Sequence, residues 1–327
     1  MTKFPHDALF KSVFQQPENA AAELQHVLPA EHASAIDWST LKLEPGSFVD
    51  DKLAAQHSDL LFSAAAHASG KRVLVYLLFE HQSTPEPKMA LRLLSCMVRI
   101  WDRCSAVDKN APLPLILPAV LSQVAGGWRS PTRFSALFSP SLGQLADIVL
   151  PDFSYAVDDL SRTDDEGLKR RELSTQARLA LWLMRDARDG ALLLQGLMAW
   201  AEELETLALT QGGERALGPL LRYVADVSPD LQLEEFRVIL RKRAPAAESI
   251  TMTIAEQLRA EGESKGEARG LLRGQAASLL VILRTRGFVV PDEVRTRIEA
   301  CTDADALQRW TSHAVTAEHL DDVFGAS

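Results

Sequence analysis

The sequence predicts an α/β domain followed by an all-helical region. Residues 58–67 and 72–82 form two strand patterns separated by a short turn containing Gly70. The second strand pattern is almost continuously apolar, which is typical of a strand buried on both faces of a sheet. Beyond Pro151 the chain becomes rich in Leu, Ala, Glu and Arg at helical spacing. Together these features indicate a small mixed sheet flanked by helices, with helices alone after it.

The remaining elements of the first part follow from local patterns and breakers. A helical pattern over residues 5–27 is interrupted at Pro17, because proline cannot continue a helix from within. Residues 41–49 read as extended, residues 86–103 as a helix, and residues 115–124 as another strand. The predicted order is therefore helix, strand, strand, strand, helix, strand.

Composition shifts divide the chain into three predicted regions. They are an α/β domain over 1–160, a helical region over 161–245, and a charged region with C-terminal helices over 246–327. Four glycines recur at every fourth position of the last region, at 262, 266, 270 and 274. Glycine weakens a helix by about 1 kcal/mol relative to Ala, so the pattern indicates either a flexible charged linker or a helix for close self-association. The second alternative predicts a homo-oligomer, most simply a dimer, through this region.

Charge and cysteine content exclude several classes of protein. The chain has 35 Lys and Arg against 44 Asp and Glu, a net charge of −9, which argues against non-specific coating of nucleic acid but not against a local cationic patch. Its three cysteines, at positions 96, 104 and 301, have no metal-ligand spacing and fit a reducing compartment. The N-terminal segment lacks a secretory pattern, and no run is long enough to span a membrane. We therefore expect a cytoplasmic protein without a membrane partner.

Two carboxylates are predicted at one edge of the sheet. In a pair of strands joined by a short turn, the start of the first lies beside the end of the second, which brings Asp59 near Glu80. Oxygen ligands of this kind suit a hard divalent cation such as Mg²⁺. Gln82 shares a strand face with Glu80, whereas His81 points away and offers only its backbone carbonyl. The pattern alone does not distinguish a metal site for phosphodiester cleavage from two solvated acids.

Three longer motifs carry a family resemblance. The runs HDALFKSVF, IDWSTLKLEPGSFVDDKLAAQHSDLLF and YLLFEHQSTPEPKMALRLLSCMVRIW resemble the Rpn family of recombination-promoting nucleases, also known as YhgA-like transposases. The resemblance covers about residues 5–160 and implies a PD-(D/E)XK restriction-endonuclease-like core. It implies that Asp59, Glu80 and Gln82 are catalytic. Asp59, Glu80 and the His81 carbonyl would bind Mg²⁺, with Mn²⁺ as a substitute, and the substrate would be DNA.

Two positions depart from the wider pattern. The superfamily element usually ends in Lys, whereas this chain has Gln82, whose amide can hydrogen-bond but carries no charge. Gln is the usual residue within the Rpn family, so this difference does not imply inactivity. Family members often carry a Tyr-His-Gly-like element after the fourth strand, and residues 122–128 (SQVAGGW) lack its histidine.

A cationic stripe is predicted on the helix that follows Glu80. Lys88, Arg92, Arg99 and Arg103 fall within about 60° of one another at 100° per residue. The other sides are crowded with apolar residues, so we expect the helix to be buried on most sides. The stripe is either a solvated face or the lining of a DNA-binding cleft.

Two functions from different classes fit these features. The first is an Mg²⁺-dependent DNA endonuclease that either promotes recombination or acts on mobile or foreign DNA. The second is a catalytically inactive relative that binds DNA or a protein, which the large helical part keeps open. A transposase in the strict sense would need a three-acid site on another fold, and no such constellation is visible in the sequence.

Overall fold

The computed structural model describes residues 5–45, 60–67, 72–80, 86–138, 151–228 and 230–325; for residues 72–80, 233 and 265 only the backbone is described. These residues form two compact units, Met1–Met252 and Thr253–Ser327. The elements of the α/β part are α1 (Pro5–Phe14), α2 (Pro17–Val27), α3 (Ala30–Ala33), β1 (Ile36–Leu43), β2 (Leu60–Ala66), β3 (Arg72–Glu80), α5 (Met89–Val107), β4 (Leu115–Ser122), the 3₁₀ turn η2 (Phe134–Leu137) and β5 (Ala156–Asp159). They are followed by η4 (Leu160–Arg162), α7 (Asp165–Lys169), α8 (Thr175–Asp186), α9 (Gly190–Ala208), α10 (Gly213–Val227), α11 (Leu233–Arg243), α12 (Pro245–Thr285), α13 (Asp292–Glu299), α14 (Ala304–Thr316) and α15 (Leu320–Phe324).

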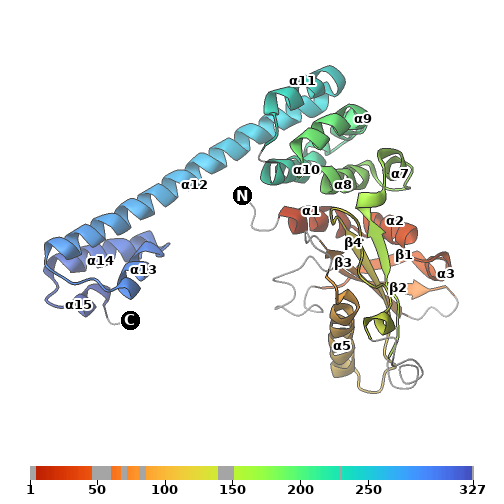
Figure 1. The fold of residues 1–327 in the computed structure, drawn as a ribbon, viewed down its shortest axis with the longest axis horizontal. Helices are drawn as coiled ribbons and strands as arrows, with labels where there is room; N and C mark the ends of the chain where they lie inside the picture. The colour runs from red at the N-terminus through yellow and green to blue at the C-terminus, as the bar shows by residue number, and fades with distance from the viewer. Residues whose placement is uncertain are drawn as a thin grey trace. The chain divides into compact units, whose positions relative to one another are not determined.

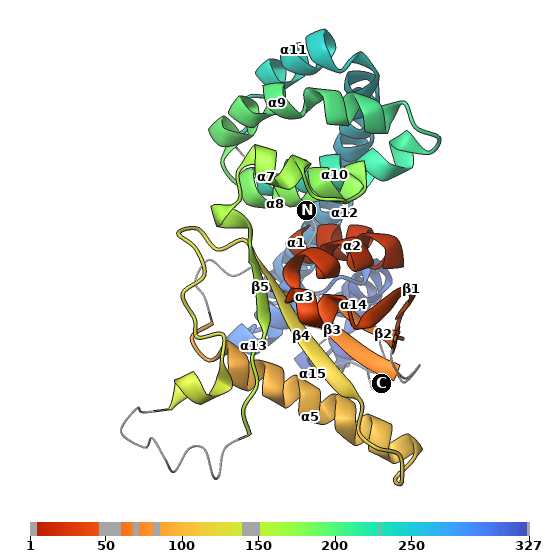
Figure 2. The ribbon, with the colours of Figure 1, turned by 90° about the vertical axis from the view of Figure 1, so that its right-hand side faces the viewer.

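The five strands form one mixed sheet in the order β1-β2-β3-β4-β5 (Figure 2). β1, β2 and β3 pair antiparallel, whereas β4 pairs parallel with both β3 and β5. The parallel step from β3 to β4 needs a crossover, and α5 supplies it. The predicted α/β class, the order of elements and the mixed sheet are therefore confirmed, as is the break between α1 and α2 at Pro17.

Two strands differ from the prediction. The first strand was expected over 41–49 but is Ile36–Leu43, and its pairing with β2 shifts between Asp37 and Lys42. At this irregularity the Thr40 hydroxyl accepts the Ala65 N–H at 2.8 Å, so a side chain replaces a backbone partner and the alternation of buried residues is lost. β5 was not predicted, because four residues with two acids give no strand pattern.

One face of the sheet is covered by α5. Its buried side chains pack with Leu61 of β2, Val120 of β4 and Tyr155 in a single apolar cluster; those of α5 in the cluster are Met89, Ala90, Leu93, Cys96 and Ile100. The expectation that this helix is buried on most sides is wrong, since Leu91 and Val98 are 45% and 43% exposed. The sheet presents only one face to α5, which therefore packs as an ordinary amphipathic helix.

A buried ion cluster lies on the opposite face, where α2 contacts β5. Neighbouring residues of a strand point to opposite faces, and Val157 packs against the α5 cluster while Asp158 points the other way. There the Arg171 guanidinium donates to both Asp158 oxygens at 2.7 and 2.9 Å and to both Glu23 oxygens at 3.2 Å. All three side chains are buried. The cluster joins α2, β5 and the segment before α8.

A second polar link follows the same path. The buried Asn19 amide of α2 donates to the Val13 carbonyl of α1 at 3.1 Å and accepts the Ser174 hydroxyl at 2.6 Å. Ser174 in turn accepts the Ala177 N–H as the N-cap of α8. The N-terminal helices are thus tied to the helical part by side-chain hydrogen bonds as well as by packing.

The helices α7 to α11 belong to the same unit as the sheet. α1 packs against α8 and α10 (Figure 1). The His6 ring forms a hydrogen bond of 2.8 Å with the Tyr223 hydroxyl of α10. α8 and α9 meet at the buried Trp182 and Trp200, whose rings stack 5.3 Å apart. The predicted all-helical character after the sheet is confirmed. The boundaries at 160/161 and 245/246 stay predictions.

The second unit has a small core of its own. The end of α12 packs with α13, α14 and α15 through buried Leu279, Leu283, Ile298 and Leu307. The Arg286 guanidinium donates to the carbonyls of Ala314 and Ala317 at 2.9 and 2.7 Å, which satisfies the end of α14. The four spaced glycines all lie within α12, and a Cβ at any of them would meet nothing within 4 Å.

We expect Arg171→Met to lower the free energy of unfolding of the first unit by about 3–5 kcal/mol, because it leaves the buried carboxyl groups of Glu23 and Asp158 without their shared cation. Arg170→Met is the matched control: its side chain is 79% exposed and only 3.9 Å from Glu166. Urea denaturation of both variants measures the difference. An Arg171→Met variant as stable as the control would contradict the role given to the cluster.

The same cluster predicts a pH dependence. Burial, and next the Asp158 carboxylate, raises the pKa of Glu23 well above its ordinary value, although Arg171 acts to lower it. Folding therefore favours the protonated carboxyl. Its contribution is complete below the unfolded-state pKa and is lost as the pH rises through the raised folded-state pKa.

The free energy of unfolding of wild type should thus fall relative to Glu23→Gln, which is always neutral, as the pH rises above the ordinary glutamate pKa. Denaturation at several pH values measures this difference, with Glu18→Gln, an exposed glutamate of the same helix, as control. A constant difference between wild type and Glu23→Gln across that range would rule the prediction out.

Candidate functional site at the strand ends

Of the predicted metal site, the structure describes only the backbone of Glu80. Asp59, His81 and Gln82 lie outside the described residues. Glu80 is the last residue of β3. The antiparallel register joins Leu60, the first residue of β2, to Leu77 of β3. The predicted hairpin is therefore confirmed, with the start of β2 beside the end of β3, while the approach of the Asp59 and Glu80 carboxylates stays a prediction.

The strand ends also bring β4 and β5 to the same edge. Glu80 pairs with Ser122, and Ser122 pairs with Asp159. Since β3, β4 and β5 run parallel, their carboxyl ends meet at one edge, which is where open α/β sheets commonly bind ligands. The sequence patterns did not point to Ser122 or Asp159, because β5 was not recognised.

Asp159 shapes the turn that follows β4. One carboxylate oxygen accepts the Trp128 N–H at 2.7 Å and lies 3.2 Å from Arg162, and the other accepts the Ser161 hydroxyl at 2.8 Å. Gly126 and Gly127 between β4 and Trp128 have φ near +85°, a region that favours glycine. A Cβ at Gly127 would lie 3.2 Å from this carboxylate. Asp159 therefore acts as a structural anchor for the segment that departs from the family pattern.

The four residues of the predicted cationic stripe differ in exposure. Lys88 and Arg99 are exposed, whereas Arg92 and Arg103 are half-buried and part of each guanidinium group is buried. The exposed Leu91 and Val98 lie beside them. The structure thus leaves two of the four cations on open surface. Their contact with DNA stays a prediction.

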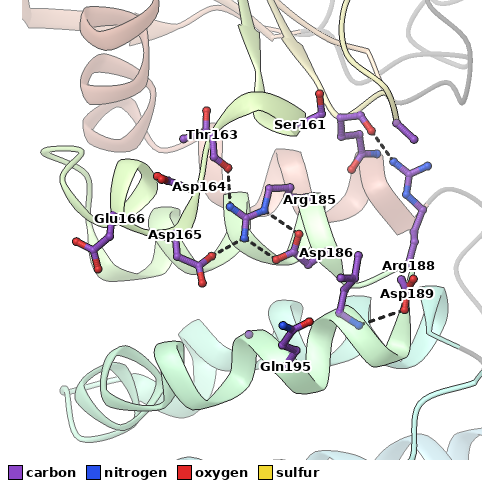
Figure 3. A pocket seen from close by; sticks show the side chains of 14 residues that line it. Ser161, Thr163, Asp164, Asp165, Glu166, Arg185, Asp186, Arg188, Asp189 and Gln195 are labelled. Carbon is purple, nitrogen blue, oxygen red and sulfur yellow. Dashed lines mark hydrogen bonds and ion pairs between the residues drawn. The ribbon is translucent and has the colours of Figure 1, made fainter.

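A pocket of about 920 Å³ lies beyond the ends of β4 and β5 (Figure 3). Its walls come from the segment after β4, from the turn between β5 and α7, and from α8 and α9. Residues that line it are Gln123, Ala125, Ser161, Thr163, Asp164, Asp165, Glu166, Arg185, Asp186, Arg188, Asp189, Leu192, Gln195 and Gly196. No sequence pattern pointed to it, because the lining is scattered along the chain.

Arg185 dominates one wall of the pocket. Its guanidinium bonds the carboxylates of Asp165 and Asp186 and donates to the Thr163 carbonyl at 2.7 Å (Figure 3). Burial acts to raise the pKa of Asp165, but the hydrogen bond and charge of Arg185 outweigh it and the pKa is lowered. Burial likewise opposes the charge of Arg185, and the two carboxylates more than compensate, so its pKa is raised. Asp165 and Arg185 are therefore both charged near neutral pH.

The described residues do not by themselves make a metal site. Among them, no group of three or more His, Cys, Asp and Glu side chains is placed to hold a metal ion. The expected donor set depends on Asp59 and the His81 carbonyl, which lie outside that part of the chain. In the same described part, none of the helices combines the length and apolar content needed to cross a bilayer.

Comparison with known proteins shows which family the chain resembles. Residues 4–213 match the family "Putative transposase, YhgA-like". The chain is 31% identical to the recombination-promoting nuclease RpnD of Escherichia coli, over 79% of this chain and 95% of that protein. It is 31% identical to RpnA, another recombination-promoting nuclease of Escherichia coli, over 79% of this chain and 85% of that protein.

A third relative has a different name. The inactive recombination-promoting nuclease-like protein RpnE of Escherichia coli is 29% identical over 93% of this chain and 97% of its own length. No solved structure matches the chain. The resemblance seen in the sequence motifs is confirmed by the family match and by these relatives: the chain belongs to the Rpn/YhgA family of recombination-promoting nucleases and YhgA-like transposases.

Proposed function

We propose that this protein is a metal-dependent DNA endonuclease that promotes recombination. The observation that carries the proposal is the sheet edge where the start of β2 meets the end of β3, in a chain about 30% identical to proteins named as nucleases. The order of elements and the mixed sheet agree with a PD-(D/E)XK-like core. The three cysteines are free, which fits action in the reducing cytoplasm.

In this proposal each residue of the edge has a separate role. Asp59, Glu80 and the His81 carbonyl hold Mg²⁺ or Mn²⁺ through oxygen. The bound cation supplies a Lewis acid that lowers the pKa of water and offsets charge on the phosphate. Gln82 orients the water or a phosphate oxygen by hydrogen bonding, since its amide has no charge to contribute.

A catalytically inactive DNA- or protein-binding protein is the second candidate. It is favoured by the similarity to RpnE, a relative named as inactive whose match extends over more of this chain than those of the nucleases. Assembly into a dimer through residues 246–327 stays a prediction for either candidate.

We expect plasmid cleavage that requires Mg²⁺ or Mn²⁺, is absent with Ca²⁺ or EDTA, and falls at least about 100-fold in Asp59→Ala and in Glu80→Ala. Glu18→Ala, which removes an exposed acid of α2, is the control and should cleave like wild type. Gel analysis of supercoiled, nicked and linear plasmid gives the rates. Cleavage retained in both site variants would place the chemistry elsewhere, and a wild type inert with every metal would favour the second candidate.

The exposed cations of α5 give a test of DNA binding that does not need cleavage. Each lost phosphate contact should lower the slope of log K against log salt by about 0.9, so Lys88→Glu with Arg99→Glu should weaken binding and flatten the slope by about 2. Fluorescence anisotropy with duplex DNA in EDTA measures this. Arg170→Glu, at another exposed arginine, is the control: it reverses one charge, as each of the two test substitutions does, and should leave the slope unchanged. A slope equal to that of wild type would show that this surface does not contact DNA.

A further inference from the structure

The pocket beyond β4 and β5 carries a net negative charge. Its lining holds five carboxylates against the two guanidinium groups of Arg185 and Arg188, which leaves three negative charges. A phosphate or another anion would be repelled there. The lining therefore favours an uncharged or cationic ligand.

The carboxylates themselves are already engaged. Asp164 caps α7 by accepting the Gly167 N–H at 2.7 Å, and Asp189 caps α9 by accepting the N–H groups of Ala191 and Leu192. Asp165 and Asp186 bond Arg185. The exposed Glu166 lies 3.9 Å from Arg170. These acids set the sign of the potential, but their hydrogen bonds belong to the fold.

The lining also contains a buried uncharged group without a partner among the described residues. Gln123 lines the pocket, is only 4% exposed, and neither its amide nitrogen nor its amide oxygen has a partner among the described residues. The Nε1–H of buried Trp182 is also without a partner in that part of the chain. Gly196, another lining residue, lies in front of it, since a Cβ there would be 2.9 Å from Trp182 Nε1. Buried polar groups are normally paired, so the unpaired Gln123 amide in the lining points to a hydrogen-bonding occupant of the pocket.

The hydrogen-bonding groups of the Gln123 amide indicate which kind of ligand would match them. Gln123 offers a donor and an acceptor side by side, and an amide can turn to a ligand by a change of side-chain rotamer without backbone movement. The matching ligand presents an acceptor and a donor at the same spacing, as the edge of a nucleobase does. A volume of about 920 Å³ is ample for a nucleoside.

The position of Gln123 connects the pocket with the proposed site. It directly follows Ser122, whose backbone pairs with Glu80 on one side and Asp159 on the other. We propose that this pocket binds a nucleobase of the nucleic-acid substrate through the Gln123 amide, with the phosphates outside. The choice of a nucleobase over another uncharged ligand rests on the proposed function.

The test measures nucleoside binding by the full chain without metal, by ligand-observed NMR and calorimetry. The probes are adenosine, guanosine, cytidine and thymidine, each compared with its 5′-monophosphate, and spermidine serves as the cationic alternative. We expect at least one nucleoside to bind wild type more tightly than its monophosphate does. Gln123→Leu should weaken that binding at least tenfold, without lowering Tm, because the amide has no partner to lose. Gln15→Leu, at an exposed glutamine of the same unit, is the matched control and should bind like wild type.

Three outcomes would overturn the inference: no nucleoside binds wild type, spermidine binds while nucleosides do not, or Gln123→Leu binds nucleosides as wild type does. If Gln123→Leu has a lower Tm than wild type, Gln123→Glu takes its place in the test. This variant keeps the shape of the side chain but removes its donors, so it should also weaken nucleoside binding. Because no cleavage is measured, these results stay separate from the plasmid assay. Nucleoside binding by a protein that cuts no DNA would overturn the proposed activity and leave the pocket assignment standing.

Discussion

The buried guanidinium of Arg171 is where three parts of the first unit meet. It holds Glu23 of α2 and Asp158 of β5 from the segment that leads into α8. Buried ion pairs return little net free energy compared with apolar replacements, but leaving one partner alone costs several kcal/mol. We infer that the cluster acts mainly by fixing geometry: only one arrangement of α2, β5 and α8 lets the Arg171 guanidinium bond both buried carboxyl groups. The short strand β5, with two acids in four residues, depends on that arrangement for its place in the sheet.

That placement has consequences for function. β5 extends the sheet beyond β4, so Asp159 lies level with Ser122 and Glu80 and anchors the turn before Trp128. The segment after β4 forms one wall of the acidic pocket, and the turn between β5 and α7 together with α8 and α9 supplies the rest. The helical part is thus no separate appendage: it packs on α1 and completes a cavity at the edge that carries the proposed nuclease residues. A family member whose helical part packed differently could keep the sheet and lose this pocket.

Much of the α/β order could be predicted from sequence because its signals are local. The apolar run of β3, the turn before it and the break at Pro17 each act within a few residues of the chain. Local signals fail for β1 and β5. In β1 the Thr40 side chain replaces a backbone hydrogen bond of the strand pair, which shifts the register. β5 is held by Arg171, which lies outside the strand. Leu91 and Val98 of α5 were expected inside but are exposed, because helical periodicity does not show how many faces of a helix a neighbour covers. Asp59 and Glu80 could be proposed from one hairpin and a family motif, whereas Gln123 joins the pocket lining only through tertiary packing.

Amide hydrogen exchange of wild type and Arg171→Met, with Arg170→Met as reference, tests most directly whether the cluster unites the first unit. We expect α2, β5 and α8 to lose protection together in Arg171→Met, while the reference resembles wild type. A loss confined to the few residues around position 171, with α2 and β5 protected as before, would contradict this expectation.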